Sequence, residues 1–130
     1  MLEGGCFCGA VRYVVRQAPF AETSCHCSIC RRTSGAPFVS WFTVADTGFS
    51  FCSGSPHRFQ SSSHGARTFC PQCGTQLTFQ STLFPGWMDV TICSLDDPEA
   101  VTPKNHTWTR AQPSWIHLAD GLPRFQEARD

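Results

Sequence analysis

The chain contains almost no lysine and has no net charge. Its 130 residues carry ten basic and ten acidic side chains, and Lys104 is the sole lysine. A protein that binds nucleic acid or an anionic lipid surface mainly through its charge needs a basic patch or stripe, which this sequence lacks. We therefore expect no nucleic-acid partner.

Long apolar runs are also missing. No stretch approaches the about 20 apolar residues that span a bilayer as a helix, so we expect no membrane association. The N-terminus, MLEGGCFCGAVRY, has neither the charged region nor the apolar region of a secretory signal. These absences predict a cytoplasmic protein.

No segment shows the sustained apolar spacing of an amphipathic helix. The stretches AVRYVVR (10–16) and PFVSWFTV (37–44) instead have the alternation or the β-branched and aromatic content of strands. Short runs with the same character follow between turns at 49–52, 57–61, 67–70, 76–80 and 88–93. We expect one mainly β domain, 1–130, of antiparallel sheets, with a single helical turn through SICRRTSG.

Cysteine, by contrast, is abundant. The sequence has nine cysteines, and an odd number cannot be fully paired in disulfides within the chain. In a reducing compartment cysteines are thiols or thiolates, and clustering then indicates metal binding. Cys52 and Cys93 stand alone in apolar strand contexts, so we expect them to be buried and unreactive.

Two of the cysteine clusters can supply the four ligands of a structural zinc site. Cys6 and Cys8 form a C-x-C pair, while Cys70 and Cys73 form a C-x-x-C turn followed by Gly74. Backbone N–H groups in such a turn can donate to the thiolates, and glycine permits the positive φ that often follows the second cysteine. A site built from both pairs would close a long loop and stabilise the fold.

A different partition would join Cys27 and Cys30 with Cys70 and Cys73 in a zinc ribbon. Residues 31–69 would then separate the two pairs, which is more than the about 15–20 residues usual in ribbons. This partition also leaves the remaining clustered cysteines without partners. We favour the first partition because it uses every clustered cysteine.

The remaining cluster, Cys25, Cys27 and Cys30, has one ligand too few for a closed tetrahedral site. Catalytic zinc sites commonly have three protein ligands and an exchangeable fourth position. A histidine distant in the sequence could instead close the site, or the three thiols could hold no metal. Three histidines are available for closure: His57, His64 and His106.

Three thiolates would make a bound zinc ion a weak Lewis acid, because their charges exceed that of the ion. Such a site suits another sulfur as its fourth ligand better than it suits hydroxide-driven hydrolysis. A thiol held there as thiolate would be a nucleophile for a small aldehyde. The resulting alkoxide needs a proton. Five side chains are candidates for supplying it: His26, His57, His64, His106 and Asp89.

The residues that follow the trio are candidates for binding the thiol. Arg31 and Arg32 could bind the carboxylates of an anionic thiol, and Ser34 and Gly35 could offer backbone N–H groups. The same arginines could equally balance the charge of the cysteine cluster, and the Ser-Gly pair could simply form the turn into the next strand.

Six segments together resemble the glutathione-dependent formaldehyde-activating enzyme family. They follow the family's order from Cys6 to about Phe125: GGCFCGAVRY, CHCSICRRTSGAPF, FCPQCGTQL, SLDDP, PKNHTW and DGLPRF. The resemblance implies an Mss4-like β-tent with two zinc ions per chain, of which the second can be partly occupied. It assigns the structural ion to Cys6, Cys8, Cys70 and Cys73 and the second ion to Cys25, Cys27 and Cys30.

The reaction that the resemblance implies is the addition of glutathione to formaldehyde, which is carbon–sulfur lyase chemistry in reverse. The family also includes centromere protein V, whose role resembles binding and not catalysis. Two functions are therefore expected to compete: a zinc-dependent enzyme that joins a thiol and an aldehyde, and a non-catalytic scaffold in which both zinc ions are structural. A homodimer is compatible with either.

Overall fold

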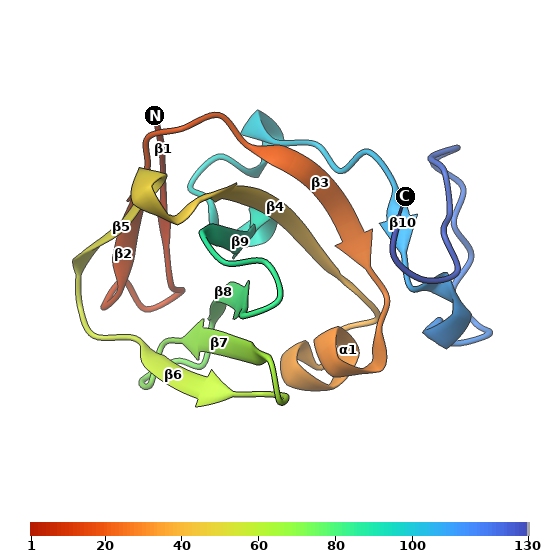
Figure 1. The fold of residues 1–130 in the computed structure, drawn as a ribbon, viewed down its shortest axis with the longest axis horizontal. Coiled ribbons are helices and arrows are strands. Elements are labelled where there is room, and N and C mark those ends of the chain that lie inside the picture. Colours follow the sequence, from red (N-terminus) through yellow and green to blue (C-terminus); the bar gives the residue numbers. More distant parts are fainter. Residues whose placement is uncertain (130) are drawn as a thin grey trace.

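The computed structural model describes residues 1–129 as two β-sheets and one short helix (Figure 1). The smaller sheet has the strand order β1-β2-β5, and both of its pairings are antiparallel. Its strands are β1 (Leu2–Gly5), β2 (Arg12–Val15) and β5 (Phe49–Ser53).

The larger sheet has the strand order β10-β3-β4-β9-β8-β7-β6. Its strands are, in that order, His106–Thr107, Phe20–Cys25, Val39–Ala45, Trp87–Thr91, Gln76–Ser81, Gly65–Phe69 and His57–Gln60. All its pairings are antiparallel except that of β10 with β3. The prediction of a mainly β fold of antiparallel sheets is confirmed, and the parallel β10 is an addition that the sequence did not indicate.

Alternation along the strands divides the two faces of the larger sheet. In β4, Phe42 and Val44 are fully buried in the hydrophobic core, whereas Trp41 and Thr43 line a cavity on the opposite face. The smaller sheet adds Tyr13 to the same core, where its ring stacks on Phe49 with centroids 5.1 Å apart. The core face thus stabilises the fold while the other face is free to line a site.

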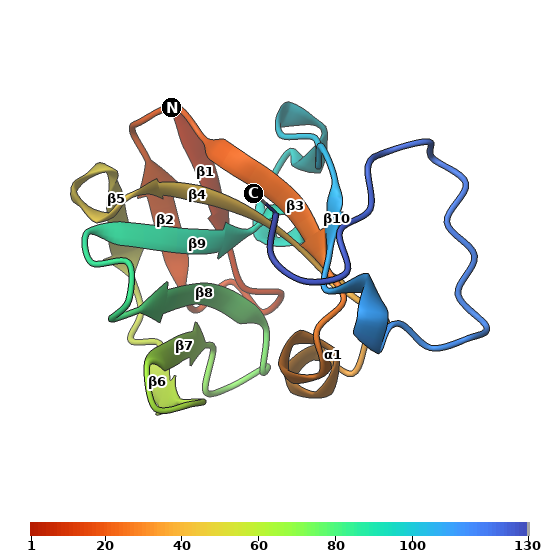
Figure 2. The ribbon, with the colours of Figure 1, turned by 45° about the vertical axis from the view of Figure 1, so that its right-hand side comes forward.

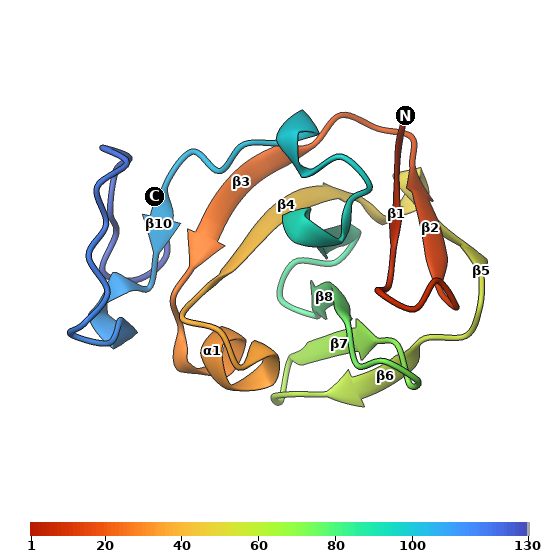
Figure 3. The same ribbon diagram turned by 180° about the vertical axis from the view of Figure 1, so that it is seen from behind.

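The helix α1 (Ser28–Ser34) begins and ends at identifiable residues. The Cys27 sulfur accepts a hydrogen bond from the Cys30 N–H at its start. Gly35 ends it with φ +69°, where its N–H donates to the Arg31 carbonyl. The predicted helical turn is confirmed. Figures 2 and 3 show α1 below the ends of β3 and β4, and in Figure 3 it lies beside β7.

Four 3-10 helices and an irregular C-terminal segment complete the described chain. The 3-10 helices span Asp46–Gly48, Ile92–Ser94, Pro98–Ala100 and Thr109–Ala111. Within residues 1–129, no helix has both the length and the apolar content to cross a membrane.

The predicted burial of two cysteines is wrong. Cys52 and Cys93 were expected to be buried, but both are exposed. Cys52 alternates with Phe49 and Phe51 in β5, so its side chain takes the outward face of the small sheet. Cys93 sits in a 3-10 helix whose buried residue is its neighbour Ile92. The apolar context of both cysteines reflected their neighbours and not their own burial.

Candidate metal centres and the adjoining cavity

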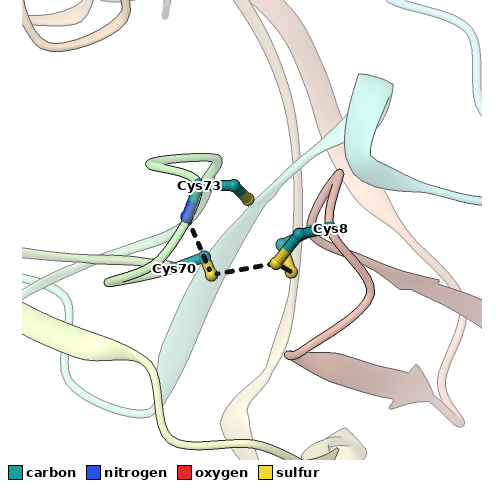
Figure 4. Close-up of side chains that lie close together, drawn as sticks. Cys8, Cys70 and Cys73 are labelled. Atoms are coloured by element: carbon teal, nitrogen blue, oxygen red, sulfur yellow. Dashed lines mark hydrogen bonds between the residues drawn. The ribbon is translucent and has the colours of Figure 1, made fainter.

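Four cysteines from two segments far apart in the sequence converge in one cluster. The sulfurs of Cys6, Cys8, Cys70 and Cys73 all lie within 4.8 Å of one another. The Cys8 sulfur is 3.6 Å from that of Cys6. It is 3.7 Å from that of Cys70 (Figure 4). This cluster, here called the quartet, could hold a metal ion and connects the small sheet to the loop between β7 and β8.

The local backbone of the quartet suits charged sulfur ligands. The N–H of Val11 donates to the Cys6 sulfur at 3.2 Å, and that of Cys73 donates to the Cys70 sulfur at 3.5 Å. Gly9 and Gly74 follow the second cysteine of each pair with φ of +83° and +82°. The positive φ expected at Gly74 is therefore observed, and it turns the chain so that both sulfurs face one point.

The other three clustered cysteines form a second group, here called the trio. Cys25 ends β3, Cys27 precedes α1 and Cys30 lies in its first turn, with all three sulfurs within 4.8 Å of one another. Within residues 1–129 no histidine, aspartate, glutamate or fourth cysteine joins this group. The structure therefore groups the seven cysteines as four and three, and not as the ribbon partition would require.

Electrostatics shows why the trio suits a cation. A hydrogen bond with Cys27 raises the pKa of Cys25, while the hydrogen bond from Cys25 lowers the pKa of Cys27 to about 2. One ionised sulfur thus suppresses the ionisation of its neighbour, because like charges this close repel one another. A divalent cation would relieve that repulsion, so the three-sulfur donor set fits a soft metal ion such as zinc.

The histidines proposed to close the trio lie elsewhere. His57 and His64 are exposed, and the His64 Nδ1 is hydrogen-bonded to the Thr82 hydroxyl at 3.1 Å. His106 is buried and lies between two partners, with Nδ1 2.9 Å from His26 Nε2 and Nε2 2.7 Å from Asp120 Oδ2. This chain of contacts holds the C-terminal segment against β3.

The trio opens into a cavity of about 900 Å³ on the face of the larger sheet opposite the hydrophobic core. Cross-strand pairs place a row of side chains on this face: Arg67 opposite Phe79, Phe79 opposite Asp89, and Asp89 opposite Thr43. Trp41 and Trp87 also line the cavity, as do the three cysteines. The cavity therefore combines apolar walls with one carboxyl group and three guanidinium groups, those of Arg67, Arg110 and Arg129, and Arg67 is the one that contacts the trio.

Asp89 is the one predicted proton donor that lines this cavity; the four histidines do not. Its carboxylate accepts a 2.6 Å hydrogen bond from the Thr43 hydroxyl. Burial raises the pKa of Asp89, and the Thr43 hydrogen bond and the charges of Arg129 and Arg67 only partly oppose this effect. A carboxyl group with a raised pKa in a cavity is suited to exchange a proton with a ligand.

The four residues predicted to bind the thiol do not line the cavity: Arg31, Arg32, Ser34 and Gly35. Arg31 donates from Nη1 to the Ala111 carbonyl at 3.0 Å, and Ser34 donates to the Cys30 carbonyl at 2.7 Å. Arg32 is exposed, and Gly35 ends the helix. The structure brings Arg67 to the trio instead. The signal for it was a lone arginine inside the strand that leads directly into the C-x-x-C turn.

Comparison with known proteins defines the family. The family model described as glutathione-dependent formaldehyde-activating enzyme matches residues 1–111. The chain belongs to this family. The match covers both cysteine groups and the strands that line the cavity, and it confirms the resemblance inferred from the six sequence segments.

Relatives of this formaldehyde-activating-enzyme family member support the assignment. A protein of Halomonas elongata, provisionally named a glutathione-dependent formaldehyde-activating enzyme, is 29% identical over 127 residues, covering 91% of this chain and 81% of its own length. An uncharacterised lyase of Schizosaccharomyces pombe is 28% identical over 120 residues, covering 81% of this chain and 87% of its own. A Rhodobacter sphaeroides crystal structure shares the fold, with a TM-score of 0.65 at 23% identity over 95% of this chain and 99% of that one.

Proposed function

We propose that this chain is a zinc-dependent carbon–sulfur lyase-like enzyme that joins a thiol, such as glutathione, to a small aldehyde, such as formaldehyde. The family description and the names of the two relatives support this class of reaction. The quartet is proposed to hold a structural zinc ion and the trio a second, exchangeable one. A cytoplasmic location and either a monomer or a homodimer are part of the same proposal.

One observation carries this proposal: a three-cysteine group opens into a cavity large enough for a thiol, and no fourth ligand from residues 1–129 closes it. A non-catalytic scaffold with two structural zinc ions would need four protein ligands at both centres. Among the described residues no fourth ligand closes the trio, and the trio lines a cavity. Both observations favour the enzyme over the scaffold.

The residues of the cavity have distinct roles in this reaction. A zinc ion on three thiolates favours a further sulfur ligand and so supplies a positioned thiolate when bound. The substrate's sulfur forms a bond to the carbonyl carbon, and the π electron pair of the carbonyl moves to oxygen. The thiol releases its proton to solvent as it binds, and Asp89 donates a proton to the carbonyl oxygen and regains one from solvent. In the cleavage direction Asp89 takes the proton back from that oxygen. The aromatic walls, Trp41 and Phe79, limit access of water.

Exchange between glutathione and its formaldehyde adduct tests the proposal. Zinc-replete wild-type protein is expected to accelerate this exchange, measured by NMR, and Cys27→Ser is expected to abolish the acceleration because the trio loses a ligand. Zinc content should fall by about one ion per chain in Cys27→Ser with the fold retained.

The matched control is Cys52→Ser, which changes an exposed cysteine outside both clusters. It is expected to keep wild-type zinc content and exchange rate. Wild-type protein that binds two zinc ions but neither binds glutathione saturably nor accelerates the exchange would refute the enzyme and leave the scaffold.

A further inference from the structure

Arg67 is a buried cation in the middle of β7. Its side chain is only 5% exposed. The guanidinium carbon lies 4.8 Å from the centroid of the Phe79 ring and 5.7 Å from that of the Trp41 ring. Two aromatic faces thus orient the guanidinium where it lines the cavity. Arginine commonly stacks on aromatic faces in this way.

The hydrogen bonds of this guanidinium are incomplete. Its Nε donates to the Ser61 hydroxyl at 3.2 Å, and Nη2 donates to the Cys30 sulfur over a long 3.8 Å. Nη1 is buried and has no partner. Within residues 1–129, no carboxylate lies within 4 Å of Arg67. A buried guanidinium with a free N–H group is costly, and a ligand carboxylate would relieve that cost.

We propose that Arg67 binds a carboxylate group of the substrate. Arginine presents a planar pair of N–H donors that matches a carboxylate. Nη1 is itself covered, so binding requires the guanidinium to turn toward the cavity that it lines. This inference rests on the proposed function for the identity of the reacting groups and adds a preference for substrates that carry a negative charge.

The position of Arg67 limits the distance between that carboxylate and the reacting atoms. Its Nη2 touches the sulfur of Cys30, a member of the trio. A carboxylate bound there lies close to the atoms that react, as in a 2-oxo acid aldehyde such as glyoxylate or a short thiol acid such as mercaptoacetate. In glutathione an amide bond separates each carboxylate from the cysteine, so its carboxylates fit this position less directly.

Arg67 could instead serve only to balance the charge of the trio, but that role does not explain why its Nη1 has no partner. Three thiolates and one divalent cation leave one negative charge, which Arg67 could neutralise through the Cys30 contact. That role would use Nη2 and would leave no reason for Nη1 to lack a partner. It would also predict an effect of Arg67 on zinc retention but none on the choice between charged and neutral ligands.

Paired ligands separate these roles and identify which substrate carries the carboxylate. Zinc-replete protein is titrated with mercaptoacetate and with 2-mercaptoethanol in one arm, and with glyoxylate and with glycolaldehyde in the other, and dissociation constants are measured by NMR. Wild-type protein is expected to favour the carboxylated member of at least one pair by about 10- to 100-fold. Arg67→Met should remove that preference while changing the affinity for the neutral member less than about twofold.

Two further variants make the result specific. Arg58→Met changes an exposed arginine on the adjacent strand β6 and should keep the full preference. Arg67→Lys keeps the charge but not the paired donors, so its preference should be reduced by several-fold. If Arg67→Met loses zinc, this lysine variant decides the matter.

The outcomes distinguish the two proposals. Equal affinity for both members of each pair in the wild type would overturn the role of Arg67. So would an undiminished preference in Arg67→Met or, if that variant loses zinc, in Arg67→Lys. A preference that depends on Arg67, in a protein that does not accelerate adduct exchange, would retain the carboxylate site and refute the enzyme. If only the thiol pair shows the preference, the thiol carries the carboxylate; if only the aldehyde pair shows it, the aldehyde does.

Discussion

Cys73→Ser is expected to leave most of the chain unfolded at room temperature, although the side chain that it removes is exposed. The quartet joins the loop after β1 to the loop between β7 and β8, so a metal ion there connects the two sheets. Structural zinc contributes about 10–16 kcal/mol in zinc-finger peptides, which is comparable to the about 5–15 kcal/mol that stabilises a whole domain. Loss of one ligand can therefore remove most of the net stability.

Because Cys73 is exposed, its replacement tests the loss of a metal ligand without disturbing the packing of the core. Cys6 and Cys70 belong to the hydrophobic core, so replacing either would also disturb packing, whereas Cys73 makes no such contribution. Circular dichroism and zinc content per chain should be compared with those of Cys93→Ser, an exposed cysteine outside both clusters. Only the Cys73 variant should lose the β-sheet signal.

The comparison with Cys27→Ser tests the division of labour between the two metal centres. That variant is expected to fall from about two zinc ions to about one and to remain folded, because the trio lies beside the cavity and only Cys30 of the three is buried. Equal loss of structure in Cys27→Ser and Cys73→Ser would contradict the assignment of a structural quartet and an exchangeable trio.

The cysteine clusters were predictable because ligand spacing is a local property of the sequence. Two residues between Cys70 and Cys73, followed by Gly74, dictate a turn in which both sulfurs face the same side. The strands were equally local, since Phe42 and Val44 alternate with Trp41 and Thr43. What spacing and alternation could not tell was which polar side chains from separate strands would meet.

Arg67 and Asp89 illustrate that limit. Each lies on its own strand, and they come to the same row only because both pair with Phe79 across the sheet. Register between distant strands sets this row, and register depends on the whole hydrophobic pattern and not on any short motif. Arg31 is the converse case: its nearness to the trio in sequence suggested substrate binding, whereas its guanidinium donates to the Ala111 carbonyl and does not line the cavity, so its role in binding stays a prediction.

Asp89→Asn is expected to slow adduct formation by about 10²- to 10⁴-fold while leaving thiol affinity nearly unchanged. Asparagine matches the shape of aspartate and keeps an oxygen that can accept the hydrogen bond from Thr43, but it cannot exchange a proton. The measurement is the NMR exchange rate at saturating thiol, together with the thiol dissociation constant. Asp46→Asn is the control, because Asp46 is exposed and does not line the cavity.

The pH dependence of this difference identifies the proton that matters. Burial raises the pKa of Asp89, so the acid form persists to higher pH than in an ordinary carboxyl group and is lost as pH rises through that pKa. The advantage of wild type over Asp89→Asn in adduct formation should therefore shrink as pH rises. Because the pKa of Asp89 is raised in the folded chain, its contribution to stability falls as pH rises through the pKa of the unfolded chain toward that of the folded chain, so Asp89→Asn should unfold at no lower denaturant concentration than wild type. A variant that is stable and equally fast at every pH would show that the proton comes from another group.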